Sequence, residues 1–93
     1  MEIRESAEDY LERILMLNKS MGQVRAVDIA NLMNFSKPSV SIALKKLRQN
    51  GYVNIDGGGY ITLTESGLEI AERVFERHRL ISQLLMALGV DEQ

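Results

Sequence analysis

The sequence of 93 residues lacks several features that would place it in other protein classes. It contains no cysteine, which excludes disulfide bridges and thiolate metal ligands and fits an intracellular protein. No apolar run approaches the roughly 18 to 20 residues that cross a bilayer. The acidic N-terminus also lacks the order of basic and then apolar residues that marks a secretory signal. We therefore expect a cytoplasmic protein with no membrane partner.

Residues that carry catalysis are equally scarce. The chain has one histidine, no cysteine and no nucleophile motif, so nothing in it indicates an enzyme. The run Gly57-Gly58-Gly59 is typical of a flexible turn, because no Gly-Lys-Ser/Thr follows it as a phosphate-binding loop requires.

The charges that are present are unevenly distributed. The formal net charge of −2 argues at first against a nucleic-acid partner, since affinity for DNA depends largely on neutralising phosphates. Residues 1–12, however, hold five acids against one base, whereas residues 36–52 hold four basic side chains and no acid. With 45% hydrophobic and 26% charged residues, we expect one globular, electrically polarised domain over residues 1–93.

Helical periodicity predicts four helices. Residues 6–9 resemble a capping box with Asp in place of Glu, and a first helix follows up to Asn18, before Gly22. A second helix is expected from about 27 to 33, after a short extended connector over 24–26. Ser36 caps a third helix that tolerates Pro38 in its first turn and is closed by Gly51. Thr64 caps a long fourth helix over 65–89, with an apolar stripe formed by Leu68, Ala71, Phe75, His78, Ile81, Leu85 and Leu88.

Two short alternating segments lie between the third and fourth helices. Residues 52–55 and 60–63 each read as a strand, and Asp56 with the three glycines reads as the loop of a hairpin. The predicted fold is therefore mainly α with a small β-hairpin: a winged helix-turn-helix with a three-helix core, a wing and a long C-terminal helix.

The third helix has the composition of a DNA-reading element. If Val40, Leu44 and Leu47 face the core together with Ala43, the opposite face is small, polar and basic. Serines can bond to several base edges, Ile42 and Pro38 can contact a thymine methyl, and the basic residues can reach phosphates. The candidate DNA-binding residues, including two from the wing, are Ser36, Lys37, Pro38, Ser39, Ser41, Ile42, Lys45, Lys46, Arg48, Gly58 and Tyr60. Since serine and isoleucine discriminate weakly, we expect two copies on a palindromic duplex; the alternative is a basic helix face that is merely solvated.

Several segments resemble the diphtheria toxin repressor family of metal-dependent regulators, in its manganese transport regulator branch. The resemblance covers nearly the whole chain and rests on Glu8-Asp9-Tyr10-Leu11-Glu12-Arg13-Ile14, Val27-Asp28-Ile29-Ala30, Lys37-Pro38-Ser39-Val40-Ser41, Leu63-Thr64-Glu65-Ser66-Gly67, Arg77-His78-Arg79-Leu80-Ile81 and Gly89-Val90-Asp91-Glu92.

The resemblance implies a homodimeric repressor that binds its operator when manganese or iron is plentiful and switches off uptake genes. It also implies Asp9, Glu12 and His78 as ligands of Mn²⁺ or Fe²⁺, and carboxylates at i and i+3 with an imidazole suit such ions. Family members continue from the helix at 65–89 into a dimerisation domain that supplies further ligands, so residues up to Gln93 hold at most a partial site. Val27 and Ile42 also depart from the family pattern, which leaves the operator sequence open, and the chain reads either as an excised domain or as a natural short form.

Other interpretations of the same residues stay open. The acids of the first helix can be a solvated first turn that complements the helix dipole, and a lone histidine in an apolar stripe is commonly a core residue. A metal-independent winged-helix regulator is the nearest rival function. A protein-interaction module is the other, docking a partner through Leu80, Ile81, Leu84, Leu85 and Leu88.

Overall fold

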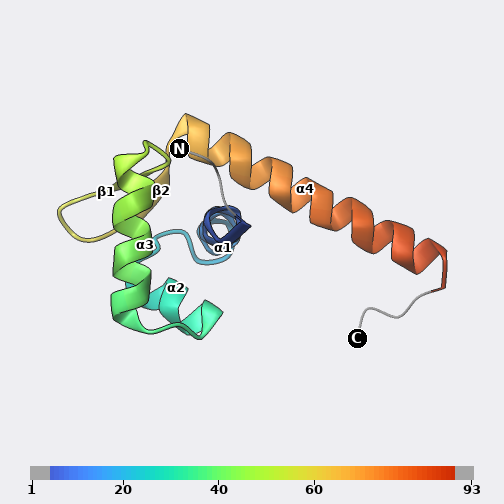
Figure 1. Ribbon diagram of the computed structural model, residues 1–93, viewed down its shortest axis with the longest axis horizontal. Helices are drawn as coiled ribbons and strands as arrows, with labels where there is room; N and C mark the ends of the chain where they lie inside the picture. The colour runs from blue at the N-terminus through green and yellow to red at the C-terminus, as the bar shows by residue number, and fades with distance from the viewer. Residues whose placement is uncertain (1–4, 90–93) are drawn as a thin grey trace.

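Helices and strands follow one another in the predicted order in this computed structural model, which describes residues 5–89 (Figure 1). The elements are α1 Glu5–Met21, α2 Ala26–Met33, α3 Lys37–Gln49, β1 Val53–Ile55, β2 Ile61–Leu63 and α4 Glu65–Ala87. This arrangement of four helices and one antiparallel hairpin confirms the winged helix-turn-helix prediction. None of the helices in residues 5–89 has the length and apolarity needed to cross a membrane.

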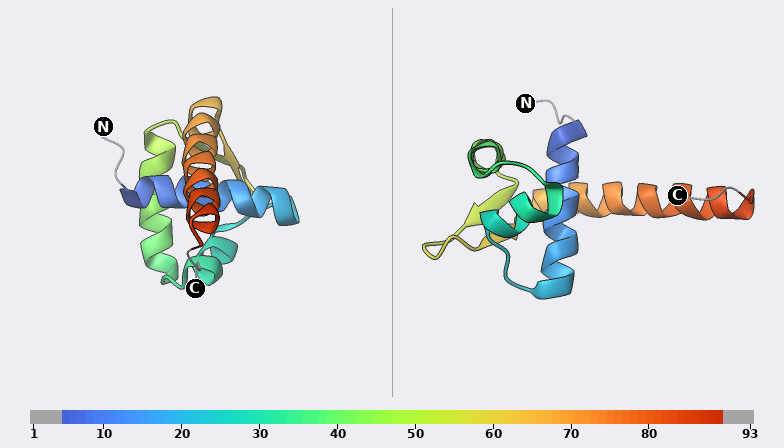
Figure 2. Two further views of the ribbon diagram at one scale, coloured as in Figure 1. Left: turned by 90° about the vertical axis from the view of Figure 1, so that its right-hand side faces the viewer. Right: turned by 90° about the horizontal axis from the view of Figure 1, so that it is seen from below.

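The core lies where α1 crosses between the helix-turn-helix and α4. Figure 2 shows α1 running across the direction of α4, with α2, α3 and the hairpin on one side of it. Every element contributes to this core, because each presents one apolar face to α1 or to its neighbours. The largest fully buried side chains are Leu11, Ile14, Ile29, Ile61, Val24, Val40, Val53 and Val74.

The ends of α1 differ from the prediction. Ser6 lies inside the helix, which already includes Glu5, so the predicted capping box at Ser6 is wrong. At the other end the helix continues past Asn18 to Met21. The side-chain amide of Asn18 then donates to the carbonyl of Gly22 at 2.9 Å, and Gly22 adopts a φ of 82° that ends the helix.

The hairpin alternates as predicted. Val53 pairs with Leu63 and Ile55 pairs with Ile61, so that one face of the hairpin is apolar and the other exposes polar side chains. The free edge of β2 is also occupied, because the N–H of Ile61 donates to the carbonyl of Val24 at 2.7 Å. The extended connector before α2 therefore forms an isolated β-bridge with β2, a pairing that the sequence analysis did not predict.

The junction between the wing and α4 is held by Thr64. Its hydroxyl oxygen accepts a hydrogen bond from the N–H of Gly67 at 3.1 Å, which caps α4, and its O–H donates to the carbonyl of Gly51 at 2.6 Å. The backbone N–H of Thr64 donates to the carbonyl of Tyr52 at 3.1 Å. One residue thus ties the start of α4 to the segment that follows α3.

The first half of α4 is buried and the second half is not. Gly67, Ile70, Ala71 and Val74 face the core. Of the predicted apolar stripe, Ala71 is therefore buried and Phe75 packs against the core, whereas Leu68 is 37% exposed. The C-terminal half of α4 extends away from the body (Figure 1). Its apolar side chains are therefore exposed there: Leu80, Ile81, Leu84, Met86 and Leu88.

Candidate nucleic-acid interface and metal-ligand pair

The turn between α2 and α3 is tight because the backbone of its first residue adopts the left-handed helical conformation. Asn34 has φ 57° and ψ 42°, a conformation that asparagine tolerates better than most residues. The N–H of Phe35 donates back to the carbonyl of Ala30 at 3.0 Å, which closes the end of α2. This geometry brings α3 directly against α2 as a helix-turn-helix requires.

Ser36 organises the N-terminal end of α3. Its hydroxyl oxygen accepts from the N–H of Ser39 at 3.3 Å, and the two serine hydroxyls lie 2.9 Å apart. Lys37 and Pro38 follow in the first turn, where proline leaves no helical hydrogen bond unmade. The predicted cap is therefore confirmed. The hydroxyl of Ser39 is already engaged by Ser36 before any ligand binds.

The face of α3 opposite the core is exposed along its length. Val40, Leu44 and Leu47 are buried, and Ile42 is 60% exposed although it is aliphatic. The other predicted DNA-contacting residues of this segment are exposed as well: Ser36, Lys37, Pro38, Ser39, Ser41, Lys45, Lys46 and Arg48. The orientation on which DNA recognition depends is thus the one that the sequence predicts.

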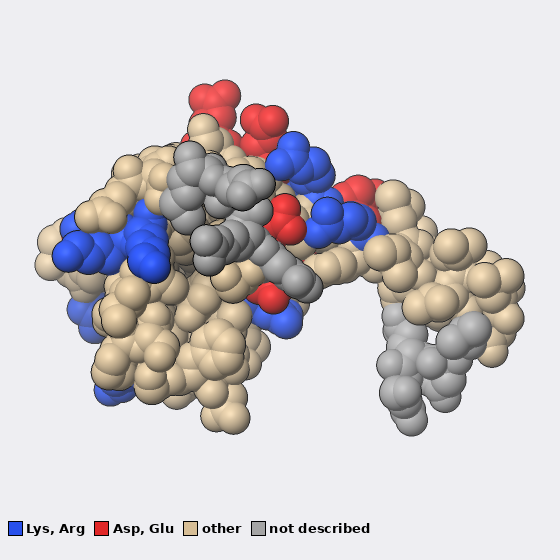
Figure 3. Space-filling model, in the orientation of Figure 1, with Lys and Arg blue, Asp and Glu red and all other residues tan. Residues whose placement is uncertain are grey.

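The charge polarisation is visible on the molecular surface. In Figure 3, Lys and Arg side chains gather over the end of the molecule formed by α3, whereas over α4 Asp and Glu side chains lie together with further Lys and Arg side chains. Residues 36–52, which include α3, carry four bases and no acid. A polyanion is therefore attracted to the side of the molecule that presents α3, despite the net charge of −2.

The wing and α3 together form a concave surface. A hollow of about 280 Å³ lies between them, lined on the α3 side by Ser41, Lys45 and Arg48, and on the hairpin side by Ile55, Gly59 and Ile61. Basic side chains at the wall of a groove are suited to contact phosphates that run along a duplex.

Gly58 and Tyr60, the two wing residues predicted to bind DNA, make contacts with other residues of the protein. The carboxylate of Asp56 accepts from the N–H groups of Gly58 and Tyr60, each at 2.9 Å. The carbonyl of Gly58 accepts from the guanidinium of Arg25, which also lies 4.8 Å above the Tyr60 ring. Contacts of Gly58 and Tyr60 with DNA stay predictions. The sequence analysis missed Arg25, because no local pattern connects it with a loop 33 residues away.

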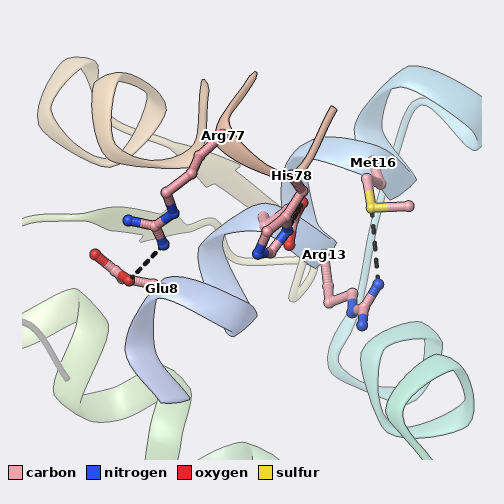
Figure 4. A network of polar contacts seen from close by, with 6 residues as sticks. Glu8, Arg13, Met16, Arg77 and His78 are labelled. Carbon is pink, nitrogen blue, oxygen red and sulfur yellow. Dashed lines mark hydrogen bonds and ion pairs between the residues drawn. The ribbon is translucent and has the colours of Figure 1, made fainter. Parts of the chain in front are cut away.

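A second polar site joins α1 to α4. The Nδ1 atom of His78 lies 2.9 Å from an Oε2 oxygen of Glu12, whose side chain is only 6% exposed while that of His78 is 50% exposed. On the same pair of helices, the guanidinium of Arg77 donates to Glu8 at 3.2 Å (Figure 4). These contacts lie where the two helices separate, beyond the last buried residue of α4.

The structure brings together two of the three predicted metal ligands. Glu12 and His78 are in contact, whereas Asp9 is partly buried, and within residues 5–89 no three carboxylate or imidazole side chains converge as a metal site needs. A hollow of about 390 Å³ adjoins the pair and is lined by Arg13, Met16, Phe75, Arg79, Ser82 and Gln83. The donor set, a carboxylate and an imidazole, suits manganese, iron or zinc, but it fills only part of a coordination sphere.

Similar proteins are DNA-binding regulators. An uncharacterized HTH-type transcriptional regulator of Methanocaldococcus jannaschii is 38% identical over 91 residues, which cover 96% of this chain and 73% of that protein. The HTH-type transcriptional regulator MntR of Bacillus subtilis is 36% identical over 88 residues, which cover 95% of this chain but only 62% of that protein.

Solved structures give the same result. The crystal structure of IdeR from T. acidophilum matches 91% of this chain and 39% of its own with a TM-score of 0.80 and 29% identity. The structure of the manganese regulator SloR matches 87% of this chain and 38% of its own, with a TM-score of 0.74 and 34% identity. The chain therefore spans well under half of the length of these two structures.

The family model described as "Iron dependent repressor, N-terminal DNA binding domain" matches residues 2–59. This stretch contains α1, the helix-turn-helix and the first strand of the wing. Members of the family are DNA-binding transcriptional regulators and not enzymes, which agrees with the exposed basic face of α3. The chain belongs to the iron dependent repressor family, also called the diphtheria toxin repressor family, and residues 2–59 match its N-terminal DNA-binding domain.

Proposed function

We propose that this chain reads operator DNA as part of a homodimeric repressor of metal-uptake genes in the cytoplasm. The observation that carries the proposal is the exposed face of α3, on which Ile42, Ser41 and Lys45 lie together while Val40, Leu44 and Leu47 are buried. In this arrangement the first turns of α3 enter the major groove. There Ser41 and Ile42 contact base edges, and Lys45, Lys46 and Arg48 hold phosphates.

Charge reversal on α3 tests DNA binding directly. Duplexes are selected from a random-sequence library with the wild-type chain, and binding is measured by fluorescence anisotropy over a range of salt concentrations. If the four bases of α3 neutralise phosphates, we expect log affinity to fall with log salt at a slope of about −0.9 per phosphate contact. Lys45→Glu should lower the affinity more than tenfold and flatten the slope by about one unit.

A matched control separates a local contact from a change in total charge. Arg73 is exposed on α4, so Arg73→Glu changes the net charge by the same amount without touching α3. We expect Arg73→Glu to bind nearly as well as the wild type. If the two variants lose affinity equally, or if wild-type binding does not respond to salt, α3 is not the DNA-contacting element.

The metal dependence is proposed from Glu12 and His78. The names of the relatives include a manganese regulator and a structure of ScaR with bound Zn²⁺. A divalent ion held by these two side chains would neutralise the buried carboxylate and crosslink α1 to α4. Further ligands, among them Asp9, are needed to complete a coordination sphere. The contact of Glu12 with His78 lies where the projecting part of α4 begins, so a metal ion bound there can change the orientation of that helix.

Metal binding is testable without DNA. Mn²⁺, Fe²⁺ and Zn²⁺ are titrated into the wild type, Asp9→Ala and Glu12→Gln while the melting temperature is followed, since a ligand that binds only the folded state raises it. Glu8→Gln is the control, because Glu8 lies on the same helix but pairs with Arg77. We expect the metal-induced rise to be lost in Glu12→Gln and kept in Glu8→Gln. Equal melting temperatures with and without every metal would favour a metal-independent regulator.

Dimerisation is proposed from the exposed end of α4. Leu80, Ile81 and Leu84 are each about half exposed or more, and this apolar surface lies on the part of α4 that follows the contacts of Arg77 and His78 with α1. Contiguous apolar surface of this kind commonly marks a protein interface. A second copy of the chain placed against it gives the twofold symmetry that a palindromic operator requires.

A further inference from the structure

The guanidinium of Arg25 joins the start of the helix-turn-helix to the tip of the wing. Its Nε atom donates to the carbonyl oxygen of Gly58 at 3.0 Å, and its Nη2 atom donates to the same oxygen. The guanidinium carbon lies 4.8 Å from the centre of the Tyr60 ring, which is the geometry of a cation–π contact. One exposed side chain therefore holds the wing by both a carbonyl and a ring.

Both ends of this contact are fixed by other hydrogen bonds. The N–H of Arg25 donates to the carboxylate of Asp28 at 2.9 Å, which holds the backbone of Arg25 at the N-terminus of α2. At the other end, the carboxylate of Asp56 accepts from the N–H groups of Gly58 and Tyr60 and gives the loop one shape. The Arg25 side chain thus connects two locally ordered segments.

The wing needs such a connection because its own pairing is small. Each strand has three residues, and a two-stranded hairpin of this size is at most marginally stable by itself. The bridge from Val24 to Ile61 anchors the base of the hairpin to the body. Gly57 and Gly58, at the tip, are exposed, and Arg25 reaches this tip from the N-terminus of α2.

We propose that Arg25 is a positioning residue for DNA binding. It holds the wing tip at the distance from α3 at which both elements contact one duplex, and so it sets how much the wing contributes to affinity. This role rests on the proposed DNA-binding function. It does not require Arg25 itself to touch DNA, because its donors are directed at Gly58 and its planar face at Tyr60.

The test uses Arg25→Lys, which keeps the charge but cannot supply a two-pronged donor or a planar face. In the free protein, amide hydrogen exchange of Gly58, Gly59 and Tyr60 is measured by NMR. On a duplex selected with the wild-type chain, affinity and hydroxyl-radical footprints are measured. We expect faster exchange at the wing tip, about tenfold weaker binding, and loss of protection flanking the site while its centre stays protected.

Two further variants sharpen the result. Tyr60→Leu removes the ring contact but leaves the hydrogen bonds from Arg25 to Gly58, so it should give part of the loss of flanking protection. Adding Arg25→Lys to it should bring the loss to that of Arg25→Lys alone, because the two changes share the ring contact. Arg73→Lys, at an exposed position on α4, should behave like the wild type. The melting temperature of Arg25→Lys should stay close to that of the wild type, since only the tip is released.

Three results would overturn the proposal in distinguishable ways. If the wild type binds DNA and Arg25→Lys leaves wing exchange and flanking protection unchanged, Arg25 does not position the wing. If affinity falls while wing exchange is unchanged, Arg25 contacts DNA directly. If the wild-type chain binds no duplex, the proposed function fails, and this role fails with it.

Discussion

Gly67 is the position at which a single added methyl group should disturb the fold most directly. It lies in the first turn of α4, and a Cβ atom built there would come within 1.9 Å of the carbonyl oxygen of Tyr52. That oxygen belongs to the backbone just before β1 and accepts the N–H of Thr64. The overlap is with main chain, so no side-chain rotation can relieve it.

The expected cost of Gly67→Ala follows from these contacts. Non-bonded atoms prefer separations of roughly 3.5 Å, so α4 and the Tyr52 backbone must move apart by about 1.6 Å. Overpacking of this kind costs about 1 to 3 kcal/mol, and losing the hydrogen bond from Thr64 to Tyr52 costs about 1 kcal/mol more. The better helix propensity of alanine offsets about 1 kcal/mol. The variant should therefore be destabilised by about 1 to 3 kcal/mol.

Urea unfolding followed by far-UV circular dichroism measures this difference. For a domain of this size the melting temperature should fall by roughly 10 °C. Gly57→Ala is the matched control, because a Cβ at Gly57 meets nothing within 4 Å, and we expect it to stay within about 0.5 kcal/mol of the wild type. A Gly67→Ala variant as stable as Gly57→Ala would refute the close approach of α4 to the Tyr52 backbone.

Substitutions at three further positions test the cap of α3, the core and the end of α4. Ser36→Ala should lower the free energy of unfolding by about 1 kcal/mol, and Ser36→Asp should restore it while weakening DNA binding by charge repulsion; equal stability of all three chains in urea would contradict the cap. Burial raises the pKa of the Tyr10 phenol, so its contribution to stability is complete below about pH 10 and is lost as the pH rises through the folded-state pKa. Unfolding free energies between about pH 8 and 11 should therefore fall more steeply in the wild type than in Tyr10→Phe, and parallel curves would argue against this burial effect. Leu84 is 59% exposed, so Leu84→Asp should leave the melting temperature unchanged and abolish self-association in sedimentation experiments, unless the wild type is itself monomeric at high concentration.

Much of the fold could be predicted because its determinants are local. The spacing of Val40, Leu44 and Leu47 fixes which face of α3 is buried, since a helix has 3.6 residues per turn whatever surrounds it. Strand alternation likewise placed Val53 and Ile61 in the core. The order of elements follows from caps and glycines that act within a few residues of each other.

The remaining features depend on contacts that are distant in the sequence. The contact of Arg25 with Gly58 spans 33 residues, and no period or motif connects the two. The apolar stripe of α4 was predicted from residues along its whole length, but the buried residues of this helix lie only in its first half, and its contacts with α1 at Arg77 and His78 are polar. The exposed apolar residues of the second half therefore shifted the predicted stripe toward Leu68 and away from Ile70 and Val74.

The candidate sites were predictable to different degrees. The DNA-facing residues of α3 needed only a helix wheel, and the structure places all of them on the exposed side. The proximity of Glu12 and His78 could not be derived from spacing, because they lie 66 residues apart on different helices. It was expected only because the chain resembles a known family.

Because α4 projects from the body, a small change in its angle moves its C-terminal end over a larger distance. The contact of Glu12 with His78 is the point about which the projecting part would rotate. From His78 to Ala87 the helix is roughly 14 Å long, at the rise per residue of an α-helix. A rotation of about 10° at this contact therefore displaces the C-terminal end of α4 by about 2 Å relative to α3. In an assembly of two copies joined at the C-terminal ends of α4, such a displacement changes the distance between the two α3 helices. Successive major grooves on one face of duplex DNA are one helical turn apart, so that distance decides whether both α3 helices can bind.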